Sequence, residues 1–302
     1  MFLARLFDTL PSFAMCAAAL AIGMVSVPAA ACEPEFLQSA QTISLTANEV
    51  GDGSRVEANE QIRIRNTGDG ECSAFLRISR FTTSGTDADR NLTVASGGQL
   101  IDILSSEVSA ASSSSDVFVP AIPGGGANSR TVPLRFGFSS QWGVASGLTT
   151  ETLLVQLVDE AGAVFDDLIL TVNLNVLPAV ELRIVGATGN NRIARIDIGA
   201  LDPRAITSSD PFGVRVWSNS PYTVTFASAN AGALTHDLGS DRIDYELRAT
   251  GREVDLTGAS PGVLGRRTRS LGEFHPLRIT VPPFVAQSGE YNDRVIVTVS
   301  AG

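Results

Sequence analysis

The sequence predicts an all-β protein made of two tandem β-sandwiches. Short segments that alternate apolar and polar residues recur along the chain, and Gly, Asn, Asp, Ser and Pro separate them. Helical periodicity is scarce by comparison. Many short alternating strands at such spacing are typical of sandwiches. A weak internal repeat then divides the chain into two related halves, which favours two sandwiches over one.

The first 31 residues have the composition of a secretory signal peptide. Arg5 supplies the positive charge, an apolar stretch runs from Phe13 to Val27, and Ala29 to Ala31 offer a cleavage site. The apolar stretch is short for a membrane span. We therefore expect residues 1–31 to be removed on export, which places Cys32 at or near the start of the mature chain.

Two cysteines remain after the signal, Cys32 and Cys72. In an oxidising compartment such a pair favours a disulfide, and no His nearby supports a metal site instead. Closing a loop of 40 positions stabilises a fold by about 4 kcal/mol in the chain-entropy model. Lipidation of Cys32 remains an alternative, although Ala29 stands where a lipoprotein signal usually has a large aliphatic residue.

The charge balance argues against some classes of partner. The chain has a net charge of −10 and contains no Lys. Nucleic acids and anionic membranes require a basic face, so neither is expected as a partner. The short basic cluster Arg266-Arg267-Thr268-Arg269 lies between Gly265 and Gly272, where a solvated loop is expected.

The expected strands follow from the alternating segments. They are Gln61–Arg65, Ala74–Ile78, Thr152–Val158, Asp167–Val172, Val180–Val185, Val214–Trp217, Tyr222–Phe226 and Arg294–Ser300. Trp217 is expected in the core because it lies in one of these strands.

The internal repeat sets the domain organisation. One copy holds Pro133–Phe136, Ser146-Gly147 and Leu153–Val158, and the other holds Pro276–Ile279, Ser288-Gly289 and Val295–Val299. The spacings agree to within about one residue. We therefore expect one sandwich in residues 32–178 and a second in residues 179–302.

The first half carries insertions that the second half lacks, including Ala110–Ser115 and a hairpin at Val158–Val164 before its last strand. Binding functions tend to lie on such insertions. The candidate surface-binding residues are Phe118, Val119, Ile122 and Trp142, in apparent loops near the flexible triple glycine Gly124–Gly126 or after Ser140. The alternative for each is that it closes an end of the sandwich.

The last segment predicts an open sheet edge. Arg294 to Ser300 alternates as a strand, and the sequence ends two residues later. Unpaired N–H and C=O groups on a sheet edge favour the addition of another strand. Tyr291, Val295, Val297 and Val299 are expected to line the groove beside this edge.

The second half resembles the spore coat protein U domain, found in subunits of archaic chaperone–usher pili. Three segments carry the resemblance: Ser218–Phe226, Arg242–Leu247 and the terminal Gly-x-Tyr-x-Asp pattern followed by an alternating strand, Gly289–Val299. The resemblance covers residues 180–302 well and residues 32–178 faintly. Leu148 stands where the family has Tyr, so the first half is divergent or specialised.

The resemblance implies an immunoglobulin-like sandwich that lacks its final strand. In that family a periplasmic chaperone fills the groove first, and a strand from the adjacent subunit replaces it at the outer-membrane usher. A chain that starts at Cys32 would have no strand of its own to donate. The resemblance therefore implies a tip adhesin that is exported to the cell surface and binds an unknown receptor.

No catalytic constellation supports an enzyme, and neither a cofactor nor a metal is expected. The two His residues, His236 and His275, are expected to be structural or solvent-facing, and no Gly-x-Ser-x-Gly elbow occurs. A carboxylate pair for glycoside hydrolysis stays open. The alternatives to an adhesin are a structural pilus or coat subunit without a receptor, the periplasmic chaperone itself, and a secreted binding protein or enzyme.

Overall fold

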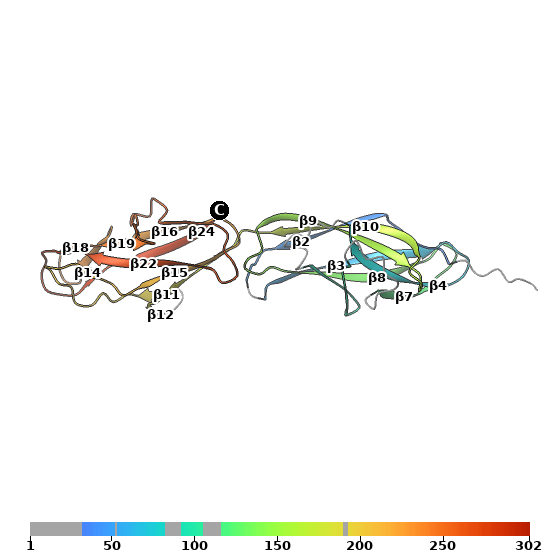
Figure 1. Ribbon diagram of the computed structural model, residues 1–302, viewed down its shortest axis with the longest axis horizontal. Helices are drawn as coiled ribbons and strands as arrows, with labels where there is room; N and C mark the ends of the chain where they lie inside the picture. The colour runs from blue at the N-terminus through green and yellow to red at the C-terminus, as the bar shows by residue number, and fades with distance from the viewer. Residues whose placement is uncertain (1–31, 52, 82–91, 105–115, 190–192) are drawn as a thin grey trace, which may run out of the picture.

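The computed structural model describes residues 32–51, 53–81, 92–104, 116–189 and 193–302. Over these ranges the chain is all-β and forms two lobes placed end to end (Figure 1). The described residues contain no helix that could cross a membrane. The signal-like residues 1–31 and the insertion Ala110–Ser115 lie outside the described residues.

The first lobe is a sandwich of two five-stranded sheets. One sheet has the order β1 (Pro34–Phe36), β3 (Arg55–Asn66), β8 (Ser129–Ser139), β5 (Leu92–Ser96) and β6 (Gln99–Ile101). The other has the order β2 (Ala40–Ala47), β10 (Val164–Val176), β9 (Gly147–Val158), β4 (Cys72–Arg80) and β7 (Val117–Ile122).

Strand β10 completes this first sandwich. It pairs antiparallel with β9 on one side and parallel with β2 on the other. Its inward residues alternate along the strand and are buried in the core; they are Leu168, Leu170, Val172 and Leu174. Both edges of β10 are therefore hydrogen-bonded, and its apolar face is fully covered.

The second lobe has a separate core and a different arrangement of strands. One layer has the order β11 (Val180–Val185), β15 (Phe212–Ser218), β22 (Glu273–Val281), β19 (Glu246–Ala249) and β20 (Arg252–Glu253), with β14 (Thr207–Ser208) also on β22. A second group of strands comprises β16 (Tyr222–Ser228) between β21 (Val263–Gly265) and β24 (Val295–Ala301), and β17 (Ala233–His236) between β18 (Arg242–Asp244) and β23 (Tyr291–Asn292). Strand β12 (Thr188–Gly189) pairs antiparallel with β13 (Ala194–Arg195).

The two lobes repeat the same strand pairings. Strand β3 pairs with β8 as β15 pairs with β22, and β4 pairs with β9 as β16 pairs with β24. The sequence repeat matched β8 with β22 and β9 with β24. Strand β24 therefore corresponds to β9, and the first lobe continues from β9 into one more strand, β10.

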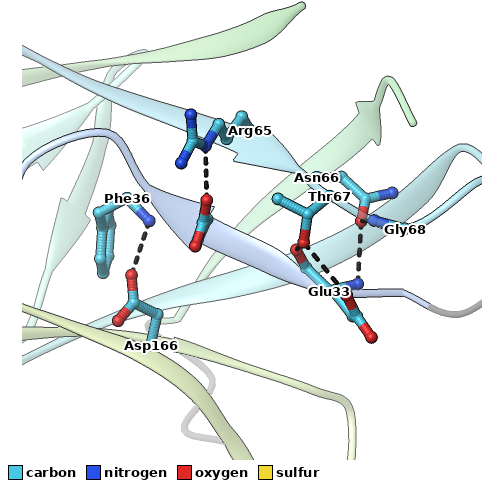
Figure 2. A network of polar contacts seen from close by, with 8 residues as sticks. Glu33, Phe36, Arg65, Asn66, Thr67, Gly68 and Asp166 are labelled. Atoms are coloured by element: carbon cyan, nitrogen blue, oxygen red, sulfur yellow. Dashed lines mark hydrogen bonds and ion pairs between the residues drawn. The ribbon is translucent and has the colours of Figure 1, made fainter. Parts of the chain in front are cut away.

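The outer end of the first lobe is held by a disulfide and a network of polar contacts (Figure 2). Cys32 and Cys72 form the predicted disulfide, with Cα atoms 5.7 Å apart. The buried Asn66 accepts hydrogen bonds through Oδ1 from the backbone N–H groups of Glu33 (2.9 Å) and Gly68 (3.0 Å). The carboxylate of Asp166 accepts another from the Phe36 N–H at 2.7 Å. The chain around β1 is thus fixed to both sheets.

Two expectations about this fold were wrong. The triple glycine is anchored, because Gly125 N–H donates to Gly68 O at 2.7 Å and Gly126 N–H donates to Asn66 O at 2.8 Å. Trp217 is half-buried outside the core, where its ring lies 5.1 Å from the Arg183 guanidinium. The alternation of β15 directs its neighbour Val216 inward and therefore Trp217 outward.

Candidate functional site

The candidate site is the open side of the second lobe, between β11 and β24. Strand β24 pairs with β16 along its whole length. Among the described residues, no strand pairs with the other edge of β24 or with the outer edge of β11. The C-terminus lies where the two lobes meet (Figure 1), so β24 runs towards the first lobe.

The residues of β24 that bond to β16 alternate with residues whose backbone groups are free, and two hydrogen bonds identify which are which. Gly302 N–H donates to Pro221 O at 2.7 Å, and Ala229 N–H donates to Arg294 O at 2.8 Å. In an antiparallel pair, alternate residues bond to the partner strand. The N–H and C=O groups that point to the free edge therefore belong to Val295, Val297, Val299 and Ala301.

The same reasoning applies to β11. Asn219 N–H donates to Ala179 O at 3.2 Å, which sets the phase of the β11–β15 ladder. The backbone groups of Val180, Leu182 and Ile184 thus point away from β15. Since β11 and β24 contact each other, two free edges border one groove.

A cavity of about 400 Å³ opens at this groove. Its apolar lining comes from both layers of the sandwich and includes Ile184, Phe212, Val214, Phe226, Leu247, Leu277 and Ile279. Three of the four predicted groove residues, Tyr291, Val295 and Val297, line this cavity. Val299 packs against the same core but does not line the cavity.

The inward face of β24 is incompletely covered. Val295, Val297 and Val299 are half-buried. The inward residues of the corresponding strand β9 are fully buried, with Leu153, Val155 and Leu157 each 0% exposed. In the first lobe the neighbouring strand β10 supplies that cover. Full burial of an exposed apolar side chain stabilises a fold by about 1.5–3 kcal/mol, and an additional strand beside β24 would gain the part of this that the half-buried valines still lack.

The groove has a further wall that sequence reasoning missed. Ala194, Ile196 and Ile198 are half-buried and line the cavity, while the alternate residues Arg195 and Asp197 are exposed. Ile196 to Ile198 belong to no strand and make no backbone–backbone hydrogen bond with any other residue that the structure describes. The alternation from Ala194 to Ile198 is a strand pattern that could have been recognised in the sequence. That this segment pairs with no described strand could not have been recognised there.

Asp293 organises one end of the groove. Its carboxylate accepts hydrogen bonds from the Tyr245 hydroxyl (2.6 Å), the Ser228 hydroxyl (2.6 Å) and the Asn230 N–H (3.2 Å). Burial and the neighbouring Asp293 carboxylate raise the pKa of Tyr245. The terminal Gly-x-Tyr-x-Asp pattern thus has a structural basis, since its Asp connects β24 to the turn after β16.

The molecule has a second open edge, and its side chains differ from those of β24. Strand β1 pairs only with Ile64 to Asn66, which leaves the rest of β3 without a partner on that side among the described strands. This part of β3 carries Arg55, Glu57 and Glu60. Charged residues on an edge oppose the addition of another strand. Strand β24 carries no ionisable side chain, so its edge lacks that protection.

The predicted surface-binding residues do not form one surface. Phe118, Val119 and Ile122 lie in strand β7 rather than in a loop. Val119 is 2% exposed and Ile122 0% exposed, so these two are core residues and not surface contacts. Phe118 is 53% exposed and packs on Phe75, with ring centroids 5.3 Å apart.

Trp142 occupies a turn between β8 and β9, separate from Phe118. It is half-buried, and its turn is at the end of the first lobe that adjoins the second, because a Cβ on the next residue, Gly143, would lie 3.6 Å from Ser270 N. A receptor-binding role for Phe118 or Trp142 stays a prediction.

The two histidines have structural surroundings. His275 is buried, and its Nε2 lies 2.6 Å from the Tyr222 hydroxyl, which donates to Glu273 at 3.0 Å. Burial lowers the pKa of His275. The rings of His236 and Tyr291 pack in a T-shaped arrangement, with their centroids 5.1 Å apart. Over the described part of the chain, no three His, Cys, Asp or Glu side chains cluster closely enough to hold a metal ion.

Solved structures similar to this chain include adhesive subunits of pili and fimbriae. One is the CsuC–CsuE chaperone–tip adhesion subunit pre-assembly complex from archaic chaperone–usher Csu pili of Acinetobacter baumannii, with 13% identity over 89% of this chain and 99% of that chain and a TM-score of 0.39. The CupB6 tip adhesin from Pseudomonas aeruginosa has 9% identity over 89% and 94% of the two chains and a TM-score of 0.38.

A third is CfaE, the adhesive subunit of CFA/I fimbria of enterotoxigenic Escherichia coli, with 8% identity over 88% and 98% of the two chains and a TM-score of 0.37. No family model and no curated protein sequence matches the chain. Similarity at these identities and scores carries no argument about function, which has to come from the groove itself.

Proposed function

We propose that the protein is a pilus subunit whose second lobe accepts a β-strand from another chain. The observation that supports this proposal is the uncharged edge of β24, where backbone groups that pair with no strand in the described part of the chain border an apolar cavity. Addition of a strand supplies a hydrogen-bond ladder and fills alternate pockets with side chains. One such strand would pair with the free edge of β24 and would also cover its half-buried valines.

The first lobe suggests how the added strand would run. Strand β10 is antiparallel to β9 and parallel to β2. Since β24 corresponds to β9, we expect the added strand to run antiparallel to β24 and away from the first lobe. Its inward residues would alternate as in β10 and fill the cavity between β24 and Ile196–Ile198.

The finer assignment is a tip adhesin of an archaic chaperone–usher pilus. In this proposal a periplasmic chaperone fills the groove first, and an adjacent subunit replaces it at an outer-membrane usher. Residues 179–302 act as the acceptor, and residues 32–178, whose sandwich β10 already completes, act as the adhesin domain that binds a surface or receptor. The role is binding at the cell surface rather than catalysis.

A peptide that mimics the missing strand tests the acceptor function. The peptide copies residues 166–176, which form most of β10, and a scrambled peptide without alternation is its control. Changing Trp142 to Phe leaves Trp217 as the sole indole, so that fluorescence reports the second lobe. Peptide at 100 times its Kd stabilises its target by about 2.7 kcal/mol, or about 10 °C in Tm for a lobe of this size.

Two matched lysine variants localise the binding. Val297→Lys places a charge on the groove side of β24, whereas Thr298→Lys places it on the exposed side of the same strand. We expect the first variant to abolish stabilisation by the peptide and the second to retain it. Equal stabilisation of both, or none of the unchanged protein, would contradict the acceptor function.

The tip assignment has its own tests. Mass spectrometry of the exported protein should place the mature start at or near Cys32. Residues 32–178 produced alone should bind the surface that intact pili bind, whereas a purely structural subunit would show no such binding. A mature chain with a long segment ahead of Cys32 would favour a position within the shaft.

A further inference from the structure

One buried turn connects the two lobes. The linker between them is the short segment Leu177–Ala179, and the turn Ser218–Pro221 lies against it. Asn219 is 1% exposed and bonds to the linker three times. Its Nδ2 donates to Leu177 O (3.0 Å), its Oδ1 accepts from Ala179 N–H (2.8 Å), and its N–H donates to Ala179 O (3.2 Å). The backbone on both sides of Pro178 is thereby fixed.

The same residue also contacts the first lobe directly. Ser146 N–H, in the loop between β8 and β9, donates to Asn219 O at 2.9 Å. The turn itself is rigid, because the buried Ser218 hydroxyl donates to Ser220 O at 2.8 Å and Thr268 N–H donates to Ser218 O at 2.8 Å. Asn219 thus bonds to the linker and to the first lobe from a turn of the second.

The turn leads directly into the open groove. Pro221 O accepts the hydrogen bond from Gly302 N–H, and the next pair along the ladder is Tyr222 with Ala301. The end of β24 is therefore attached to the residue that lies two positions after Asn219. Two consecutive backbone pairings, Pro221 with Gly302 and Tyr222 with Ala301, thus connect the end of β24 to this turn.

We propose that the turn Ser218–Pro221 is a rigid joint, centred on Asn219, which couples the strand beside the groove to the orientation of the first lobe. Without the joint, a linker of three residues would let the lobes reorient, because contacts between domains of one chain are small by default. An added strand orders β24. Because the end of β24 is bonded to the turn, ordering the turn then costs less conformational entropy, so the joint becomes more ordered as well. The coupling step rests on the proposed strand addition.

Residual dipolar couplings of the exported full-length chain test the joint itself. If the lobes form one rigid body, the couplings of both lobes fit a single alignment tensor. We expect a single tensor for the unchanged protein and two tensors for Asn219→Ala. Two tensors in the unchanged protein, or one in Asn219→Ala, would overturn the rigid joint.

Two variants at Ser146 test the joint from the first lobe. Because Ser146 lies outside the second lobe, these substitutions do not alter that lobe's own residues. Ser146→Pro removes the N–H that Asn219 O accepts, whereas Ser146→Ala retains it. We expect separate tensors for the proline variant and one tensor for the alanine variant. The same tensors in both would show that this hydrogen bond does not hold the joint.

Hydrogen exchange tests the coupling to the groove, with the peptide of residues 166–176 as the added strand. We expect the peptide to slow exchange of the Ala179 and Ser146 amides about tenfold in the unchanged protein and to leave them unaltered in Asn219→Ala. Protection of the Val297 amide without any change at Ala179 and Ser146 would overturn the coupling. No protection at Val297 would instead contradict strand addition. The dipolar couplings would still show whether the two lobes form one rigid body.

Discussion

Tyr245 donates a 2.6 Å hydrogen bond to Asp293, and both residues line the open groove of the second lobe. Tyr245 belongs to the connection between β18 and β19, whereas Asp293 lies just before β24. The bond therefore links the start of β24 to the point where the chain passes from β18 to β19. It positions the start of β24 while the rest of its free edge stays open.

Removal of this hydroxyl should destabilise the second lobe without filling or closing the groove. Tyr245→Phe deletes a hydrogen bond to a charged acceptor, for which we expect a loss of about 1.5–3 kcal/mol. Tyr291→Phe is the matched control, because the Tyr291 hydroxyl donates to Gln287 O in an exposed position. Urea unfolding followed by Trp217 fluorescence measures both variants. An equal loss of stability in the two variants would mean that the bond from Tyr245 to Asp293 stabilises the lobe no more than an exposed hydrogen bond does.

The disulfide should stabilise the first lobe alone. Replacing Cys32 and Cys72 with Ser opens a loop of 40 residues, and we expect the first lobe to lose about 4 kcal/mol. Trp142 lies in the first lobe and Trp217 in the second, so Trp217→Phe and Trp142→Phe backgrounds report the two lobes separately. A comparable loss in the second lobe would show that the lobes unfold together.

A buried ion pair in the first lobe provides a larger effect. Arg77 and Asp116 form a bidentate contact, with Nη2 2.8 Å from Oδ2 and both side chains buried. Arg77→Met removes one partner of a buried, bidentate ion pair, which should cost about 3–5 kcal/mol.

The control for this variant is an exposed pair of the same type. Arg248 and Glu246 are 2.9 Å apart and about half exposed, so Arg248→Ala should change stability by less than about 0.5 kcal/mol. Denaturant titration compares the two changes. Equal losses would argue that burial of the Arg77 pair has no energetic consequence.

The second lobe should lose stability in mild acid because of His275. Its pKa is lowered in the folded state by burial, so the unfolded chain binds more protons as the pH falls through about 6.5. Stability is therefore full above this pH and declines below it. His275→Gln should flatten that part of the profile in unfolding followed at Trp217. An unchanged slope in the variant would assign the acid sensitivity to other groups.

Local sequence patterns predicted most of the strands because alternation depends only on neighbouring residues. The segments Val180–Val185, Tyr222–Phe226 and Thr152–Val158 all lie in strands, and the internal repeat matched strands that pair in the same way in both lobes. The disulfide was also predictable, since the two cysteines after residue 31 allow a single pairing. These features depend only on composition and on the order of neighbouring residues.

The sequence by itself determined the all-β class, the two related halves and the apolar terminal strand, because period-two alternation specifies strands wherever they pair. Tertiary structure decided which of those strands has a free edge. Val119 and Ile122 looked like loop residues until pairing with β4 placed them in the core. Ile196 and Ile198 became part of a groove wall, and Asn219 a joint, only through partners far along the chain. Hydrogen-bond partners and burial are set by long-range packing, which no local pattern encodes.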